Sequence, residues 1–165
     1  LVQANISDVQ ITEKKDAIPQ IDLQYVVDTE QYGNKTGNRL FIPANIFRKG
    51  FTTPELKQRI QDVHINYGYL DTDSILLQIP EGYAIESLPK SYKAKNKFGT
   101  FSSSLQVKGK VIYIVHRLLM HKGVYPKESY KDFLEFRKQI AGQYNSKIIL
   151  KKEVLPAQGG APSDG

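Results

Sequence analysis

Apolar and polar residues alternate with a period of two along much of the chain. The pattern runs through residues 21–27, 63–69, 74–79 and 101–107. Its apolar positions on one side are Ile21, Leu23, Tyr25, Val27, Val63, Ile65, Tyr67, Tyr69, Ile75, Leu77, Ile79, Phe101, Leu105 and Val107. Such alternation is typical of antiparallel strands that bury one face. The chain is therefore predicted to be built mainly from antiparallel β-strands.

Residues 111–120, VIYIVHRLLM, are apolar on both faces for most of their length. This pattern predicts a central strand that is covered on both sides. A short buried helix would give a similar run. The enrichment in β-branched and aromatic residues favours the strand.

Glycine and proline residues mark the loops and turns between the predicted strands. Lys108-Gly109-Lys110 is predicted to be a hairpin loop, and residues 32–38 and 95–99 are predicted to be longer loops. Pro80 lacks an amide donor and Gly82 permits a sharp bend, so Pro-Glu-Gly should end one strand and turn into the next. The next short strand, with Tyr83 and Ile85 on one face, should close at Leu88-Pro89 as an edge or a corner between sheets.

One segment follows a helical period instead. Within residues 125–144, apolar side chains recur three and four positions apart. Pro126 suits the first helical position and Asn145 suits the stop, so a helix is predicted over 126–143. The residues expected to be buried through it are Tyr130, Phe133, Leu134 and Ile140. A further helical turn is predicted within 54–60.

About eight short strands and one C-terminal helix predict an immunoglobulin-like antiparallel β-sandwich over residues 1–152. Residues 153–165 are rich in Pro, Gly, Ala and Ser, and we expect a flexible tail there. The chain begins with Leu1, which we interpret as a processed or shortened chain, so the lack of a signal peptide carries no information.

The amino-acid composition excludes several classes of reactive site. The 165-residue chain has no cysteine, which excludes disulfides, thiolate nucleophiles, cysteine-bound zinc and iron–sulfur clusters within it. No apolar run approaches the roughly 20 residues of a membrane-spanning helix. The net charge of +6 is compatible with an acidic partner, but most Lys and Arg residues are scattered singly.

The histidines and aspartates that could bind a metal do not match a complete metal-site motif. His64, His116 and His121 are assigned structural or surface roles because their spacing does not suit a metal site. Asp71 and Asp73 resemble part of a calcium loop, but the rest of that pattern is missing, so residues 70–74 are predicted to be a turn between strands.

Other polar groups are also interpreted as structural. Ser102, Ser103 and Ser104 lack a nucleophile-elbow context and should lie on a solvated strand. Glu81 and Glu86 could form a hydrolytic carboxylate pair, although exposed loop glutamates are commoner. Asn5 and Asn34 match a glycosylation pattern that also arises by chance. Residues 91–97 are the densest basic run; with Tyr92 as their single aromatic residue, they predict an edge strand and no nucleic-acid site. No catalytic residue, metal ligand or cofactor is assigned, and binding residues are left open.

An ordered set of segments resembles a known type of domain. The segments are R-x-x-D-V-x-I-x-Y at 59–67, IPEGYAIESLP at 79–89, KGVYPKESYKDFLEF at 122–136 and KIILKK at 147–152. They resemble the C-terminal domain, of unknown function, of three-domain Gram-negative bacterial proteins whose middle domain is transglutaminase-like. The likeness is clear over 59–152 and loose over 1–58.

The resemblance implies a periplasmic, outer-envelope or secreted protein and a noncatalytic role, because the catalytic Cys-His-Asp set belongs to the middle domain. It also implies that the corner around Pro80 and Pro89 passes between two sheets. Two hypotheses follow. The chain either packs on and orients the adjacent transglutaminase-like domain, or is a free-standing module that binds an anionic glycan or cell-wall polymer. An independent hydrolase is a distant third.

Overall fold

The computed structural model describes residues 2–48, 56 and 59–153, and the chain divides into two compact units. The first unit, Leu1–Asn34, is a long hairpin of β1 (Val2–Lys14) and β2 (Gln20–Gln31), paired antiparallel. Its register shifts between Ser7 and Gln10, where Asp8 has a φ of 52°. One extra residue in β1 therefore forms a bulge, and Asp tolerates this left-handed conformation better than most residues.

The second unit, Lys35–Gly165, contains the main sheet. Its four antiparallel strands lie in the order β6 (Tyr69–Gln78), β10 (Val111–Met120), β9 (Gly99–Lys108) and β8 (Tyr92–Asn96). Two-residue turns at Lys97-Phe98 and at Gly109-Lys110 join β8 to β9 and β9 to β10. These tight turns fix the register of three neighbouring strands.

A second four-stranded sheet has the order β3 (Asn34–Thr36), β4 (Arg39–Pro43), β12 (Lys147–Lys152) and β7 (Tyr83–Ser87). A short 3-10 turn, η1 (Ile46–Arg48), follows β4. A separate two-stranded ladder pairs β5 (Val63–Ile65) with β11 (Gly123–Tyr125).

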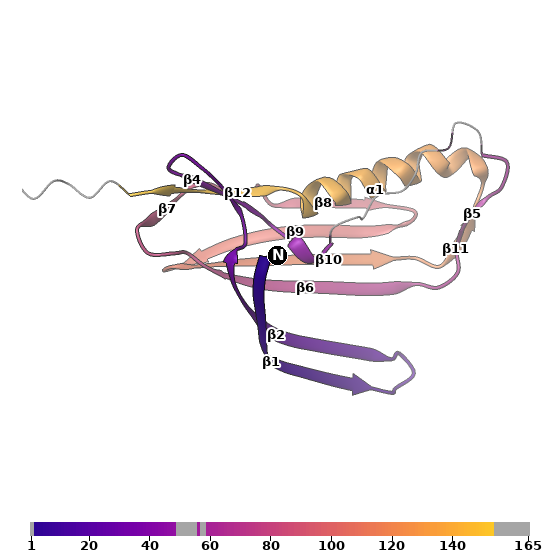
Figure 1. Cartoon of the computed structure of the whole chain (residues 1–165). Helices are drawn as coiled ribbons and strands as arrows, with labels where there is room; N and C mark the ends of the chain where they lie inside the picture. Colours follow the sequence, from indigo (N-terminus) through magenta and orange to yellow (C-terminus); the bar gives the residue numbers. More distant parts are fainter. Residues whose placement is uncertain (1, 49–55, 57–58, 154–165) are drawn as a thin grey trace, which may run out of the picture. The chain divides into compact units, whose positions relative to one another are not determined.

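Helix α1 (Tyr130–Tyr144) follows the 3-10 turn η2 (Lys127–Ser129) and covers one face of the main sheet. The second sheet continues along the same side from the end of α1 (Figure 1). The core cluster joins Phe98, Phe101, Leu118 and Met120 of the sheet side to Phe136, Ile140 and Tyr144 of the helix. Because no other described element of this unit forms a second layer on the opposite side, that face of the main sheet is open among the described residues.

The predicted fold class is confirmed: the chain is mainly β, its sheets are antiparallel, it has one C-terminal helix, and the arrangement is consistent with a sandwich. The Pro80–Gly82 corner is also confirmed. Tyr83 N donates to Pro80 O at 3.3 Å, and Gly82 has a φ of 72°. The chain passes there from β6 of the main sheet to β7 of the second sheet, and it returns to the main sheet at β8.

Several local predictions are corrected. Residues 111–120 form a central strand, but only one face is covered, since Val115 and Leu119 are exposed. Residues 70–74 lie inside β6 and are not a turn. The loop expected at 95–99 is a two-residue turn, and 34–36 within the other expected loop form β3.

The helix prediction is confirmed in its position and partly in its buried face. Tyr130 and Ile140 are buried, whereas Phe133 and Leu134 are half-buried. Phe136, 2% exposed, is a core residue that the prediction omitted. The turn predicted within 54–60 lies largely outside the described residues, as does the tail from 154 onward. None of the helices in the described part of the chain is long and apolar enough to cross a membrane.

Candidate functional site

Three side chains form a polar row under the main sheet. In the strand register, Asp73 of β6 lies opposite His116 of β10, and His116 lies opposite Ser103 of β9. His116 and Ser103 are 1% and 2% exposed. The row therefore has the residue types of a hydrolytic triad, but it belongs to the covered face of the sheet.

The contacts of this row are those of a packed core. Both ring nitrogens of His116 and Oγ of Ser103 lack a hydrogen-bond partner among the described residues. The imidazole packs between the rings of Phe101 and Tyr144, with centroid distances of 6.1 and 5.1 Å. A triad needs a nucleophile–base hydrogen bond and access for substrate. Neither is present, so we interpret the row as structural.

Burial also sets the ionisation of this region. Desolvation lowers the pKa of His116, against a smaller opposite effect of Asp73, and favours the neutral imidazole. Desolvation raises the pKa of Tyr144 to about 12, so its phenol stays protonated at neutral pH. A neutral ring beside a neutral phenol can be buried at far lower cost than a charged pair.

Arg48 supplies the charge partner for Asp73. The segment after β4 brings Arg48 Nε to 3.0 Å from Asp73 Oδ2 and its Nη2 to 3.0 Å from Oδ1. Arg48 Nη1 lies 3.2 Å from Asp71 Oδ2, and Asn45 Nδ2 donates to Asp73 at 3.2 Å. Hydrogen bonding to Asp73 raises the pKa of Arg48. The two aspartates thus fasten this segment to β6.

The remaining sequence candidates are dispersed. His64 and His121 are exposed on β5 and after β10, and His121 Nδ1 is 3.3 Å from Lys97 O. Glu81 sits in the exposed corner before β7, while Glu86 pairs with Arg39 at 2.5 and 2.6 Å. This hydrogen bonding to Arg39 lowers the pKa of Glu86. The two glutamates are therefore not joined as a catalytic pair.

The two glycosylation candidates are surface residues, and the described part of the chain shows no metal site. Asn5 and Asn34 are exposed on strands β1 and β3. Across the described ranges, no three His, Asp or Glu side chains gather in a way that could hold a metal ion.

Arg59 and Asp62 of the 59–67 segment have structural roles. Arg59 donates from Nε to Gln61 O at 2.8 Å and from Nη2 to Asp62 O at 3.0 Å, and its guanidinium lies 4.7 Å from the ring centroid of Tyr130. Asp62 accepts from the backbone amide of Lys127 at 3.0 Å. These contacts tie the segment before β5 to the start of the helical region.

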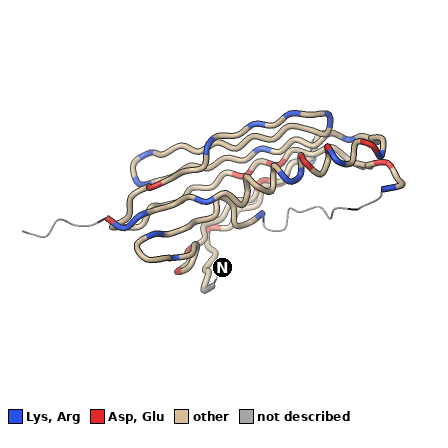
Figure 2. The backbone as a smooth tube through the Cα atoms, turned by 90° about the horizontal axis from the view of Figure 1, so that it is seen from above, with Lys and Arg blue, Asp and Glu red and all other residues tan. Residues whose placement is uncertain are grey.

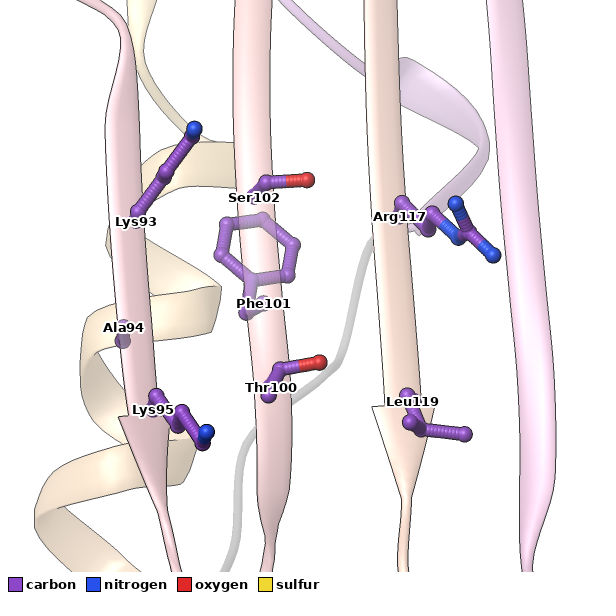
Figure 3. A pocket seen from close by; sticks show the side chains of 8 residues that line it. All are labelled: Lys93, Ala94, Lys95, Thr100, Phe101, Ser102, Arg117 and Leu119. Atoms are coloured by element: carbon purple, nitrogen blue, oxygen red, sulfur yellow. The ribbon is translucent and has the colours of Figure 1, made fainter.

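A hollow of about 450 Å³ lies on the open face of the main sheet, and we call it the cationic hollow. Its lining residues are Lys93, Ala94, Lys95, Thr100, Phe101, Ser102, Arg117 and Leu119. Figure 3 shows that Phe101 and Ala94 point to the helix side, while the other labelled side chains stand on the viewer's side. The register places Lys93, Ser102 and Arg117 in one row across β8, β9 and β10, and Lys95, Thr100 and Leu119 in the next row.

The open face carries charge of one sign. Lys and Arg positions are spread over the whole backbone (Figure 2), so net charge alone marks no site. Within β6, β8, β9 and β10, which the structure describes in full, the only carboxylates are Asp71 and Asp73, and both point to the covered face. The open face presents Lys93, Lys95 and Arg117 together with Lys108, which lies farther along β9.

The hairpin carries a separate apolar surface, which we call the hairpin face. It comprises Ile6, Ile11, Ile21, Leu23 and Val27, which the register and the strand alternation place on one side of β1 and β2. Ile11, Ile21 and Leu23 are 69%, 70% and 55% exposed. The opposite side carries Asp22, Asp28 and Glu30. Glu13, opposite Ile21, also lies on the apolar side, and Lys14 and Val26 lie on the other, so the ribbon has one mainly apolar and one mainly polar side.

The sequence pattern predicted the apolar side of residues 21–27, but as a buried face, and it identified neither the polar row nor the cationic hollow. The two-residue turn at Gly109-Lys110 was a usable signal, because it pairs Ser102 with Arg117 and Ser103 with His116. No such turn links Asp73 to His116. Between β6 and β10 the chain passes through β7 of the second sheet and through β8 and β9, so the sequence does not indicate that these two strands pair.

Comparisons with known proteins identify a family without assigning it an activity. A family model described as a domain of unknown function with a solved structure, DUF3858, matches residues 38–150. The match begins earlier than the clearest part of the resemblance, at 59, and it leaves the hairpin outside. No curated protein and no solved structure gives a significant match to the chain. Because the matched residues make up more than half of the sequence, the chain belongs to the DUF3858 family of domains of unknown function.

Proposed function

We propose that this chain is a noncatalytic domain that packs against and orients a neighbouring transglutaminase-like domain, in a periplasmic, outer-envelope or secreted protein. The observation that carries the proposal is the hairpin face. A two-stranded ribbon has no second layer of its own, and an isolated hairpin is marginally stable at best. Large exposed apolar surfaces on folded proteins mark interaction sites.

The position of the hairpin in the sequence supports this choice of partner. The family match begins at residue 38, so the hairpin precedes the family domain. The resemblance places a transglutaminase-like domain on that same N-terminal side. Contact through the hairpin face would bury side chains such as Leu23, each worth roughly 1.5–3 kcal/mol when fully removed from water.

The chemistry of the chain supports a noncatalytic role. The sequence has no cysteine to act as the nucleophile of a transglutaminase-like reaction. His116 and Ser103 are buried in the core, and no hydrogen bond joins them to each other or to the half-buried Asp73. Turnover of peptide, amide or glycan substrates by the isolated chain, abolished by Ser103→Ala or Asp73→Asn, would overturn this part of the proposal.

Hydrogen–deuterium exchange tests the docking. The chain is compared alone and within the longer polypeptide that carries its natural N-terminal neighbour. We expect the amides of residues 2–31 to exchange more slowly in the longer polypeptide, because docking restricts local opening of the ribbon. Leu23→Ser should reverse this protection.

Val26→Ser is the matched control. Val26 is 51% exposed, close to the 55% of Leu23, but it lies on the opposite side of β2. It should leave the protection unchanged. Equal exchange of the hairpin in both polypeptides, or equal effects of the two variants, would contradict docking through the hairpin face.

A further inference from the structure

We propose that the cationic hollow binds a carboxylate-bearing glycan, such as a uronic-acid oligosaccharide. This site lies in the second unit and uses none of the hairpin residues, so it does not depend on the proposed docking function. The hollow combines a concave surface, three cationic side chains from the two strands β8 and β10, and two hydroxyl side chains from β9 between them. It would bind the glycan along the sheet face.

The arrangement of cations follows from the strand register. Lys93 and Lys95 are two residues apart on β8, a distance of about 7 Å along a strand. Arg117 lies in the same row as Lys93, two strands away, which is about 10 Å at the usual strand spacing. Three positive groups at this spacing suit an extended ligand with repeated negative charges rather than one small anion.

The three cations are available to a ligand. Lys93, Lys95 and Arg117 are exposed, and among the described residues they make no ion pair or hydrogen bond with another side chain. Arg can bind a carboxylate through two parallel hydrogen bonds, and Lys acts as a mobile point charge. Because the open face of the four strands carries no carboxylate, it would attract an anionic ligand, and no carboxylate of that face would compete with the ligand for Lys93, Lys95 and Arg117.

Three cations could also stand on a sheet face simply because that face is in water, but this explanation does not account for the position of all three. Lysines on β8 also protect an edge strand from pairing with other chains, and this explains Lys93 and Lys95. Arg117 stands on the central strand β10, where edge protection has no role. Its alignment with Lys93 across Ser102 is the feature that indicates a site.

The polar groups of the hollow favour a glycan over a peptide or a nucleic acid. Thr100 and Ser102 offer hydroxyl groups to sugar hydroxyls, and Leu119 offers an apolar contact to the C–H side of a sugar ring. β9 and β10 are paired on both edges, so their backbone cannot add a peptide strand, and a strand added at the free edge of β8 would lie beside the hollow and not across it. No aromatic side chain stands on the open side of the hollow, since Phe101 points to the core, and stacked bases would therefore lack a platform.

Isothermal titration of the full chain with oligogalacturonate tests the proposal. We expect binding that weakens with added salt and that drops at least tenfold in the triple variant Lys93→Gln, Lys95→Gln, Arg117→Gln. A neutral maltooligosaccharide of equal length should not bind. Because the substituted side chains are exposed, thermal unfolding should show that the variant remains folded.

A second triple variant, Lys131→Gln, Lys138→Gln, Lys147→Gln, is the matched control. It removes the same charge from exposed positions of α1 and β12, away from the hollow. It should retain wild-type affinity. No binding of oligogalacturonate, or an equal loss in both triple variants, would overturn the site. Tighter hollow-dependent binding of poly-glutamate or of single-stranded DNA would overturn the assignment to a glycan. Since these measurements do not involve the hairpin, their failure is distinct from failure of the docking proposal.

Discussion

Arg48 holds Asp73 with hydrogen bonds to both carboxylate oxygens, although the two residues come from different parts of the fold. Asp73 sits on β6 of the main sheet, and Arg48 follows β4 of the second sheet. Their side chains are 22% and 31% exposed. The pair therefore connects the two sheets at a place that is only partly shielded from water.

Arg48→Met should lower the free energy of unfolding by about 1–3 kcal/mol, because it leaves a half-buried carboxylate with one polar partner fewer. Urea denaturation at neutral pH measures this. Arg39→Met is the comparison, since it breaks a bidentate pair with Glu86 at the surface, where such pairs contribute little. Equal losses in the two variants would show that the Arg48 pair has no special role.

The buried imidazole of His116 should make stability depend on pH. Its pKa is lowered in the folded state by burial, so the unfolded chain binds a proton first as the pH falls below about 6.5. Stability from this group is complete above that pH and is lost as the pH falls toward the folded pKa, by up to about 1.4 kcal/mol per pH unit. The charged groups facing it are Asp73 and Arg48, beside the phenol of Tyr144.

His116→Leu should therefore flatten the change in urea midpoint between about pH 7.5 and pH 5.5. It should cost little at the higher pH, because both ring nitrogens lack partners among the described residues. His64→Leu removes an imidazole that is exposed to water on β5 and should retain the wild-type slope. A wild-type slope in His116→Leu would contradict the assignment.

Two phenylalanines of α1 should differ in their contribution to stability. Phe136 is 2% exposed and belongs to the core cluster, so Phe136→Ala should cost about 3–5 kcal/mol. Phe133 is half-buried, with its ring 5.2 Å from that of Phe98, and Phe133→Ala should cost clearly less. Thermal and urea unfolding measure both. The reverse order would mean that the helix is rotated relative to the sheet.

Two glycines should respond in opposite directions to alanine. A Cβ at Gly99 would lie 2.0 Å from the carbonyl oxygen of Leu119 on the paired strand β10. Gly99→Ala must therefore displace backbone and should cost about 1–3 kcal/mol. Gly142 in α1 has open space around its Cβ position, and Gly142→Ala should stabilise the helix by up to about 1 kcal/mol. The sign of each change in melting temperature is the readout, and a tolerated Gly99→Ala would mean that β9 and β10 separate easily.

Local pattern determined much of this protein in advance. Period-two alternation located β2, β9 and the second half of β6, and the helical period located α1 within a few residues of its observed bounds. Pro80 and Gly82 identified the corner between sheets through their own backbone restrictions. These features depend on residues close together in the sequence, which is why one sequence sufficed to predict them.

Tertiary structure alone decided which surfaces are covered and which side chains meet. The run at 111–120 is apolar on both sides, but the helix and the second sheet lie on one side only, so Arg117 faces outward and His116 inward. Lys93 shares a row with Arg117 through two consecutive hairpin registers, and Asp73 binds Arg48 through the packing of segments from two sheets. Periodicity assigns a residue to one side of its strand; the partner that covers that side depends on contacts between segments far apart in the chain.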